Sequence, residues 1–446
     1  MEKDIGKEFI EFAVKTRYED IPQETLQFTK YLTLKTVSGM LAGSEKPAGK
    51  KMAGMIKDQK LPQEVRVVGG GFKTSLWEAG FLQAFFAHAS ELEDDRFDEH
   101  EYGVSWDITV IPPVFAVADK LNLSGKALLE ALAVGLEVHT RSCTFHAQNL
   151  GLMVMPGAVG PAIGVAKALG LGAKEMAGAL GLGLSGVPLS VLSFGSEAHF
   201  FESALMSLQG LMAAEMAKAG LKGNPDLGTY LSLHLGKEKS VLQKMVDDLG
   251  KRWVLREIWI KKYPACFLMH PQIDSIIELK KEHNLTLDDV EVIEIHGGPL
   301  DTNCNRPDPK DENDIQFSFQ NALSVAMLDG DVGLRHITME AVDDPVLKEA
   351  RKKVAFILHP ELSSEIFKDK TKVVVKTKDG KSFTRERQYP LGHPTLPLTT
   401  EQFRGLYSKF TKGILSESDM SKTADIILNL EKYSTNDLMN IISLGG

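Results

Sequence analysis

Helical periodicity over the first 262 residues is the feature that most constrains the fold. Segments such as EFIEFAVKT, KALLEALAVGLEVHTRS and SALMSLQGLMAAEMAKAG carry apolar residues at i, i+3 and i+4, the spacing of one helix face. Turn signals at 121–125 and 169–172 separate neighbouring segments. This pattern predicts a large all-helical domain.

The pattern changes near residue 262. Residues 289–298, DVEVIEIHGG, alternate apolar and polar side chains and predict a half-buried strand. Residues 371–388 predict a hairpin around Asp379-Gly380. We expect helices at QFSFQNALSVAMLDG, at DPVLKEARKKVAFIL and in the tail. The predicted fold is mainly α: an all-helical domain of residues 1–262 and 398–446, and a smaller α+β domain of residues 263–397.

Charge and cysteine content limit the partners. The formal net charge is −9, which argues against nucleic acid because phosphate binding needs a basic face. Three cysteines without CxxC spacing predict a reducing compartment. The first residues, MEKDIGKEFIEF, do not resemble a signal peptide, so we expect a cytoplasmic protein. Residues 176–196 are uncharged and long enough to cross a bilayer, but their Gly, Ser and Pro content predicts a buried helix followed by a loop, and no membrane partner.

An acidic stretch at residues 88–107 lies between two apolar flanks and includes His88 and His100. Neither HExxH nor DxDxDG is present, so we predict no metal site and no cofactor, although an incidental divalent-ion site among the carboxylates stays open. GxSxG is absent, which disfavours a serine hydrolase. The triple glycine at 69–71 follows a strand-like run but lacks the phosphate-loop patterns, and it predicts a plain turn.

Three histidines are candidates for proton transfer. His270 lies in KKYPACFLMHPQID, where the composition changes, and domain junctions favour small-molecule sites. His199 follows the glycine-rich segment, where a buried helix is expected to end. His88 lies about one helical turn before Glu91. Imidazole titrates near neutral pH, so each can move protons there.

Several ordered blocks resemble the MmgE/PrpD family, which includes 2-methylcitrate dehydratase, cis-aconitate decarboxylase and iminodisuccinate epimerase. The blocks are HASELEDD, IPPVFAVADKLNLSGKALLEALAVGLEVHTR, GAVGPAIGVAKALGLGAKEMAGALGLGLSG, KKYPACFLMHPQID, IQFSFQNALSVAMLDGDVG and PLGHPTLPLTTEQF. The resemblance implies a helical domain, a smaller α+β lid domain, a cleft between them and a homodimer. It also implies proton removal next to a carboxylate of a small organic acid, without an obligatory cofactor.

The resemblance assigns roles unevenly. An acidic family position falls on Glu91, a threonine position on Asp95 and an active-site lysine position on His199, while His270 stays in place. With these four as the expected catalytic residues, the expected substrate-binding residues are Ser105, His100, Arg141, His146, Asn321 and Lys262. Ser105 stands at a catalytic histidine position with His100 nearby, His146 lies near Gly151 at a second histidine position, and Asn321 replaces a tyrosine.

These departures remove positive charge, so we expect a less anionic substrate than a tricarboxylate. The expected function is lyase or isomerase chemistry, by dehydration, decarboxylation or epimerisation. The alternative is a catalytically silent paralog that binds a small molecule. A third possibility for the acidic stretch is an interface or lid loop of the dimer.

Overall fold

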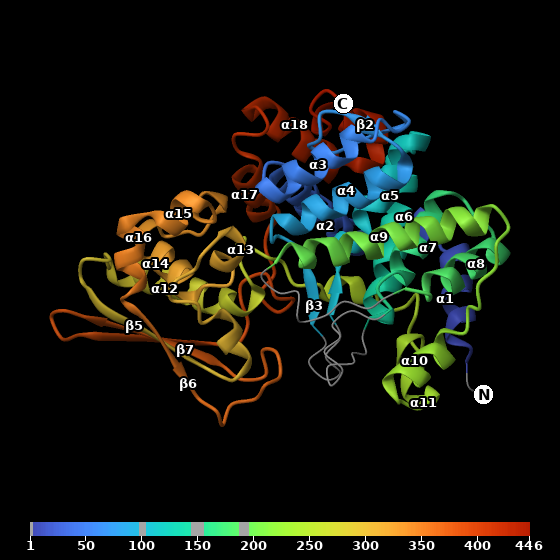
Figure 1. The fold of residues 1–446 in the computed structure, drawn as a ribbon. Helices are drawn as coiled ribbons and strands as arrows, with labels where there is room; N and C mark the ends of the chain where they lie inside the picture. The colour runs from blue at the N-terminus through green and yellow to red at the C-terminus, as the bar shows by residue number, and fades with distance from the viewer. Residues whose placement is uncertain (1–2, 98–103, 144–155, 187–195) are drawn as a thin grey trace. The chain divides into compact units, whose positions relative to one another are not determined.

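The computed structural model describes residues 3–97, 104–143, 156–186 and 196–446, which divide into two compact units (Figure 1). Unit 1 comprises Met1–Phe194, Ala198–Ile258 and Thr399–Gly446, and unit 2 comprises Gly195–Glu197 and Trp259–Leu398. The fold is mainly helical with a small mixed sheet in the C-terminal region, as the sequence predicts.

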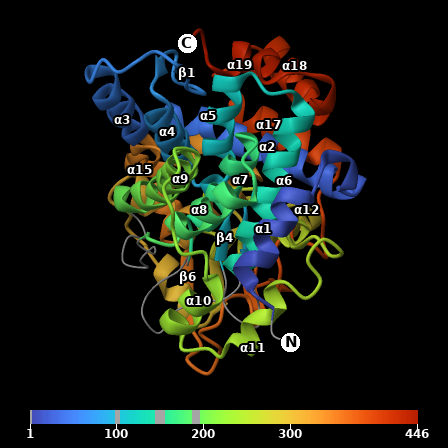
Figure 2. The same cartoon turned by 90° about the vertical axis from the view of Figure 1, so that its right-hand side faces the viewer.

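Unit 1 is built mostly of helices, several of which pack on the buried helix α2. Its helices are α1 (Ile5–Lys15), α2 (Gln23–Ser44), α3 (Pro47–Asp58), α4 (Leu76–Ala89), α5 (Ile111–Leu121), α6 (Gly125–Ser142), α7 (Val159–Ala168), α8 (Ala173–Gly183), α9 (Glu197–Lys218), α10 (Leu227–Leu235), α11 (Lys239–Leu242), α17 (Thr400–Thr411), α18 (Glu417–Leu428) and α19 (Thr435–Ile442). Helices α4, α6, α17 and α18 all contact α2 (Figure 2).

Small residues allow α6 and α7 to approach closely. A Cβ atom at Gly160 would stand 2.2 Å from the Cβ of His139, and one at Gly135 would stand 2.8 Å from the Cα of Gly164. Both contacts are shorter than atoms can tolerate, so only glycine fits at Gly160 and Gly135 in this packing. The small residues expected to bring helices together do so here.

The C-terminal helices belong to unit 1 and are joined to its first part by specific contacts. Tyr31 stacks on Phe403 with ring centroids 4.1 Å apart and an interplanar angle of 8°. Lys30 forms a 2.6 Å ion pair with Glu431. Segments far apart in the sequence therefore share one core.

Two short hairpins interrupt the helices of unit 1. Strands β1 (Val65–Arg66) and β2 (Lys73–Thr74) flank the triple glycine, whose Gly69 and Gly71 amides donate to the carbonyls of Ile442 and Ser443. These backbone bonds occupy the amides that a phosphate would need, and they support the prediction of a turn. Strands β3 (Asp95–Phe97) and β4 (Val104–Trp106) form the second hairpin, which corrects the expectation of an all-helical domain.

Unit 2 combines helices with a four-stranded sheet in the order β6-β5-β7-β8. Its elements are α12 (His270–His283), α13 (Glu312–Ile315), α14 (Phe319–Asp329), α15 (Met339–Asp343), α16 (Pro345–Arg351), β5 (Val290–Gly297), β6 (Val354–Leu358), β7 (Thr371–Thr377) and β8 (Ser382–Arg387). Strand β6 pairs parallel with β5, and the other pairs are antiparallel. The predicted strand at 289–298 and the predicted hairpin are confirmed.

Residues 354–358, VAFIL, are strand β6 and not the end of a helix as predicted. Helix α16 stops at Arg351, and the apolar run that follows pairs with β5. A short apolar run does not distinguish helix from strand by periodicity alone. Elsewhere, none of the helices described is both long enough and apolar enough to span a bilayer. Of the uncharged run at 176–196, the first part lies in α8, and residues 187–195 fall outside the described ranges.

Candidate active site

Helix α4 carries His88 into the interior of unit 1. The sequence LWEAGFLQAFFAHA is apolar on most faces, so the helix is buried along almost its whole length, and His88 in its last turn is fully buried. The chain then turns at Glu91, which has a φ of +55°. A side chain in this left-handed region costs about 1 kcal/mol or more, and such strain clusters at functional sites.

Strands β3 and β4 lie within the acidic stretch of residues 88–107. Asp95 pairs with Trp106 in the antiparallel register. One residue outward, the amide of Asp94 donates to the Asp107 carboxylate at 3.0 Å, and the Asp107 amide donates to the Asp94 carbonyl at 3.3 Å. This pairing places the Trp106 indole edge-on to His88, with ring centroids 4.6 Å apart.

Helix α9 brings His199 and Ser203 to the same place. The His88 and His199 ring centroids lie 4.2 Å apart, and His88 Nδ1 is 2.7 Å from Ser203 Oγ. The Ser203 hydroxyl donates to the Phe200 carbonyl at 3.0 Å, so its oxygen accepts from Nδ1–H of His88. In the neutral ring this arrangement places the hydrogen on Nδ1 and leaves the lone pair on Nε2, which lies 4.0 Å from a carboxylate oxygen of Glu93.

His88, Glu91 and His199 form a compact group. One ring nitrogen of each histidine and one carboxylate oxygen of Glu91 all lie within 4.8 Å of one another, and all three residues are buried. The group comes from helix α4, the strained turn after it and helix α9. It combines two groups that can accept or donate a proton near neutral pH with one carboxylate.

Buried carboxylates surround this group. Among the described residues, five acidic side chains of the stretch are 3% exposed or less: Glu91, Glu93, Asp94, Asp95 and Asp107. Burial, and then the nearby Asp94 charge, raises the pKa of Asp107 well above its ordinary value, although a 2.5 Å hydrogen bond from Thr36 opposes this rise. The nearby buried Lys35 also favours the Asp107 anion. The site therefore carries an excess of potential negative charge.

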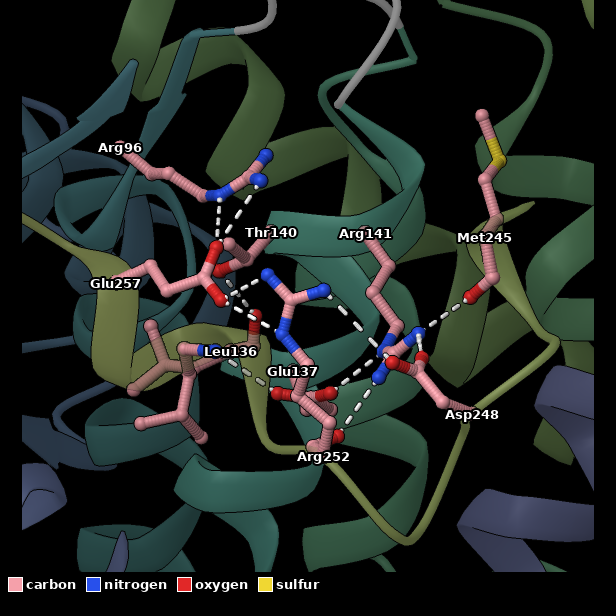
Figure 3. Close-up of polar contacts among 10 residues, drawn as sticks. Arg96, Leu136, Glu137, Thr140, Arg141, Met245, Asp248, Arg252 and Glu257 are labelled. Atoms are coloured by element: carbon pink, nitrogen blue, oxygen red, sulfur yellow. Dashed lines mark hydrogen bonds and ion pairs between the residues drawn. The ribbon is translucent and has the colours of Figure 1, made fainter. Parts of the chain in front are cut away.

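Arg141 lies in an internal network of polar contacts rather than beside this group (Figure 3). Its guanidinium donates to Glu137 at 2.6 Å, to Asp248 at 2.7 Å, and to the carbonyls of Met245 and Arg252 at 2.9 and 2.7 Å. The side chain is 2% exposed. With these acceptors in place, Arg141 serves as part of the framework of unit 1, and the geometry does not support a substrate contact.

The same network reaches strand β3. Arg96 donates to Glu257 at 3.1 and 3.2 Å, and Glu257 also pairs with Arg252 (Figure 3). Arg96 follows Asp95 directly, so its ion pair anchors the strand that carries this carboxylate. The ion pairs Arg96–Glu257 and Glu257–Arg252 thus connect β3 to residues 252–257, which follow α11.

In unit 2, His270 opens helix α12 and is fully buried. Its Nε2 lies 3.2 Å from the Ala265 carbonyl, which only accepts, so Nε2 carries the hydrogen and Nδ1 the lone pair of the neutral ring. The ring stacks on Phe267 at 4.7 Å. Lys262 forms a 2.8 Å ion pair with the buried Asp274, which also accepts from Tyr263 at 2.7 Å. This part of unit 2 thus holds a buried histidine and a largely buried Lys262–Asp274 ion pair.

Asn321 is buried within unit 2. Its Oδ1 accepts from Arg351 at 3.2 Å, and its Nδ2 donates to the His336 carbonyl at 3.3 Å. Both ends of the amide are therefore used in internal bonds.

The structure brings two of the expected catalytic residues, Glu91 and His199, together. Asp95 is buried on β3, Ser105 lies opposite Arg96 on β4, and His100 and His146 lie outside the described residues. The expected set omitted His88, Trp106 and Ser203. The one-turn spacing of His88 and Glu91 was visible in the sequence, but no local signal points to Trp106 or Ser203.

Comparisons with known proteins agree with this architecture. Residues 7–229 match the MmgE/PrpD N-terminal domain, and residues 263–432 match the MmgE/PrpD C-terminal domain. A cis-aconitate decarboxylase of Aspergillus terreus is 24% identical over 469 residues, covering 96% of this chain and 94% of the relative. The cis-aconitate decarboxylase of Mus musculus is 24% identical over 377 residues, covering 79% of this chain and 75% of the relative.

Proposed function

This chain belongs to the MmgE/PrpD family, and from that premise we propose that it is a lyase or isomerase acting on a small carboxylic acid. The reaction removes a proton from the carbon next to a carboxylate and ends in dehydration, decarboxylation or epimerisation. The observation that carries the proposal is the buried contact of His88 and His199 beside Glu91. Proton abstraction next to a carboxylate needs such a base close to neutral pH.

We assign proton transfer to His199 and His270, with Glu91 and Asp95 as the catalytic carboxylates. The tautomer of His270 leaves a lone pair on Nδ1, which suits a base. His88, oriented by Ser203, joins the group in unit 1. We keep four residues as proposed substrate contacts: Ser105, His100, His146 and Lys262. Arg141 and Asn321 make internal hydrogen bonds, and we propose a structural role for both.

The charge of the site points to the substrate class. The buried carboxylates disfavour a trianion, and burial, followed by the charge of Asp94, raises the pKa of Asp107 well above its ordinary value. A mono- or dicarboxylate is favoured over a tricarboxylate. We also propose that the protein is a homodimer, as the family resemblance implies, and that it is cytoplasmic, in keeping with the free thiols of Cys143, Cys266 and Cys304.

The test is exchange of the hydrogen next to the carboxylate, measured by NMR in deuterated water over a panel of mono-, di- and tricarboxylates. We expect exchange or turnover with at least one mono- or dicarboxylate, and a loss of about 100-fold or more in His199→Asn. His234→Asn, at an exposed histidine of α10, is the matched control.

Absence of exchange across the panel in a folded protein would contradict the enzyme proposal. If a carboxylate then raises the melting temperature and is recovered unchanged, the silent ligand-binding alternative is correct.

A further inference from the structure

We propose that His88, Glu91 and His199 bind a divalent transition-metal ion of the Zn²⁺ type, whose open position takes the substrate carboxylate. The second half of this inference rests on the proposed function, whereas the binding of the ion does not. The inference adds a bound cation to the site described above.

The donor set matches that of catalytic zinc sites, in which two imidazole nitrogens and one carboxylate oxygen leave a fourth position open. Ligand atoms around a tetrahedral Zn²⁺ ion lie about 3.4 Å apart, given metal–ligand bonds of about 2.0–2.2 Å. The three candidate atoms already lie within 4.8 Å of one another. Side-chain shifts of about 1 Å or less bring them to bonding distance.

Ser203 orients His88, the first proposed ligand, in the way that metal sites require. Ser203 accepts from Nδ1–H of His88 at 2.7 Å, so the lone pair is on Nε2, the nitrogen to which we assign the ion. A hydrogen bond to the opposite nitrogen is the usual device that fixes the tautomer of a metal-bound histidine. Ser203 is itself fully buried and held by the Phe200 carbonyl.

Glu91 is held in place by its backbone. Its positive φ of +55° is an unusual conformation for a side chain other than glycine, and its amide donates to the His88 carbonyl at 2.9 Å. The strained turn thus places the Glu91 carboxylate two residues beyond the end of helix α4, near His88 in the helix's last turn. Observed strain of this kind is a reason to look for function.

Electrostatics provides a separate argument. Burying several carboxylates costs free energy unless they are protonated or lie near a cation. Asp94, Asp95 and Asp107 all lie buried close to the group in sequence and fold. A divalent ion adds positive charge to this buried site and favours the entry of an anionic carboxylate. When the ion is bound, His199 is a ligand, and the proton transfer assigned to it above passes to Asp95.

The test uses the full chain, stripped of metal with a chelator, and titrated with Zn²⁺, Co²⁺ and Ca²⁺. We expect one Zn²⁺ per chain, a tetrahedral Co²⁺ absorption spectrum, and binding of Ca²⁺ at least 100-fold weaker because imidazole nitrogen favours Zn²⁺ over Ca²⁺. Equal affinity for Ca²⁺ would overturn the proposal, because it would indicate binding by the carboxylates alone.

Variants locate the ion. His88→Ala and His199→Ala should each weaken Zn²⁺ binding at least 100-fold, and Ser203→Ala about 10- to 100-fold. His234→Ala, at the exposed histidine of α10, should bind like the parent. Because a core variant can fail to fold, Glu91→Gln, which keeps the size of the side chain, provides the second measurement through loss of the Co²⁺ spectrum. Unchanged binding in folded His88→Ala or Glu91→Gln would overturn the assignment.

The two proposals fail separately. Turnover that persists after metal removal would leave the proposed function standing and contradict the metal as the carboxylate ligand. Binding of one Zn²⁺ with no turnover on any carboxylate would support the ion and contradict the enzyme.

Discussion

The imidazoles of His88 and His199 lie in van der Waals contact inside unit 1, with ring centroids 4.2 Å apart and planes inclined by 50°. They come from helices α4 and α9, which carry them to one place although many residues separate them in the sequence. Two buried rings this close act as a unit, because protonation of one disfavours protonation of the other.

A double-mutant cycle tests this coupling. We expect His88→Asn and His199→Asn each to lower kcat by about 100-fold or more, and the double variant to lose little beyond either one, because groups that act as a unit are not additive. Steady-state kinetics on an active carboxylate measures the effect. If the double variant instead loses kcat by the product of the two single losses, the two rings work separately.

Ser203 positions His88 and does not need to touch the substrate. Ser203→Ala removes the acceptor for Nδ1–H and should cost about 1–3 kcal/mol of stability, with a changed pH profile of kcat. Ser203→Thr keeps the hydroxyl and should restore the profile. If alanine and threonine give the same pH profile, the hydrogen bond is not what orients the ring.

Asp107 makes the stability of the protein depend on pH. Its folded-state pKa is raised, so the folded protein holds this proton more tightly than the unfolded chain does. Its contribution to the free energy of unfolding is therefore fully present at pH values below the ordinary aspartate pKa and is lost as pH rises toward the folded value. As pH rises through this range, the melting temperature of the Asp107→Asn variant should fall less than that of the parent protein. The exposed Asp58→Asn control should follow the parent.

Arg141 is predicted to be a structural residue. Arg141→Ala leaves the buried Glu137 without its cation and should lower the free energy of unfolding by about 3–5 kcal/mol, measured by urea denaturation. The double change Glu137→Gln and Arg141→Met removes both charges and should cost less. A variant of normal stability with a raised KM would instead assign Arg141 to the substrate.

Cys143 should resist alkylation in the folded protein. Burial raises the pKa of its thiol to about 12, and it lies 3.7 Å from His139, whose pKa burial lowers to about 3. Both groups are neutral near pH 7, and the thiolate that reacts with iodoacetamide forms only as pH approaches 12. Mass spectrometry should find Cys266, which is partly exposed, modified first. Rapid modification of Cys143 would show that the α6–α7 region opens.

Regular patterns in the sequence predicted much of the fold. Alternation located β5, and the Asp379-Gly380 turn located the β7–β8 hairpin, because both signals are local. Strand β6 was missed because its apolar run is explained only by pairing with β5. The β3–β4 hairpin was missed because aspartate, at Asp94, Asp95 and Asp107 in and next to its short strands, is a poor strand former, and because the pairing includes the hydrogen bond from the Asp94 amide to the Asp107 carboxylate.

The candidate site, like the fold, was predictable from the sequence only in part. Glu91 and His199 were expected from the resemblance, whereas the left-handed turn that brings Glu91 near His88 lies beyond helix α4 and was not predicted. The contact of His88 with Ser203 joins two helices, and no periodicity encodes a hydrogen bond of that kind.

The glycine hairpin of unit 1 has a consequence for the order in which the protein is made. The amides of Gly69 and Gly71 bond to Ile442 and Ser443, and α17–α19 complete a core whose other helices precede unit 2. The first part of the helical unit therefore leaves the ribosome without its last layer, and the unit cannot close until residues 399–446 have been synthesised. Unit 2, encoded in one continuous stretch apart from three residues, can fold while it is still attached to the ribosome.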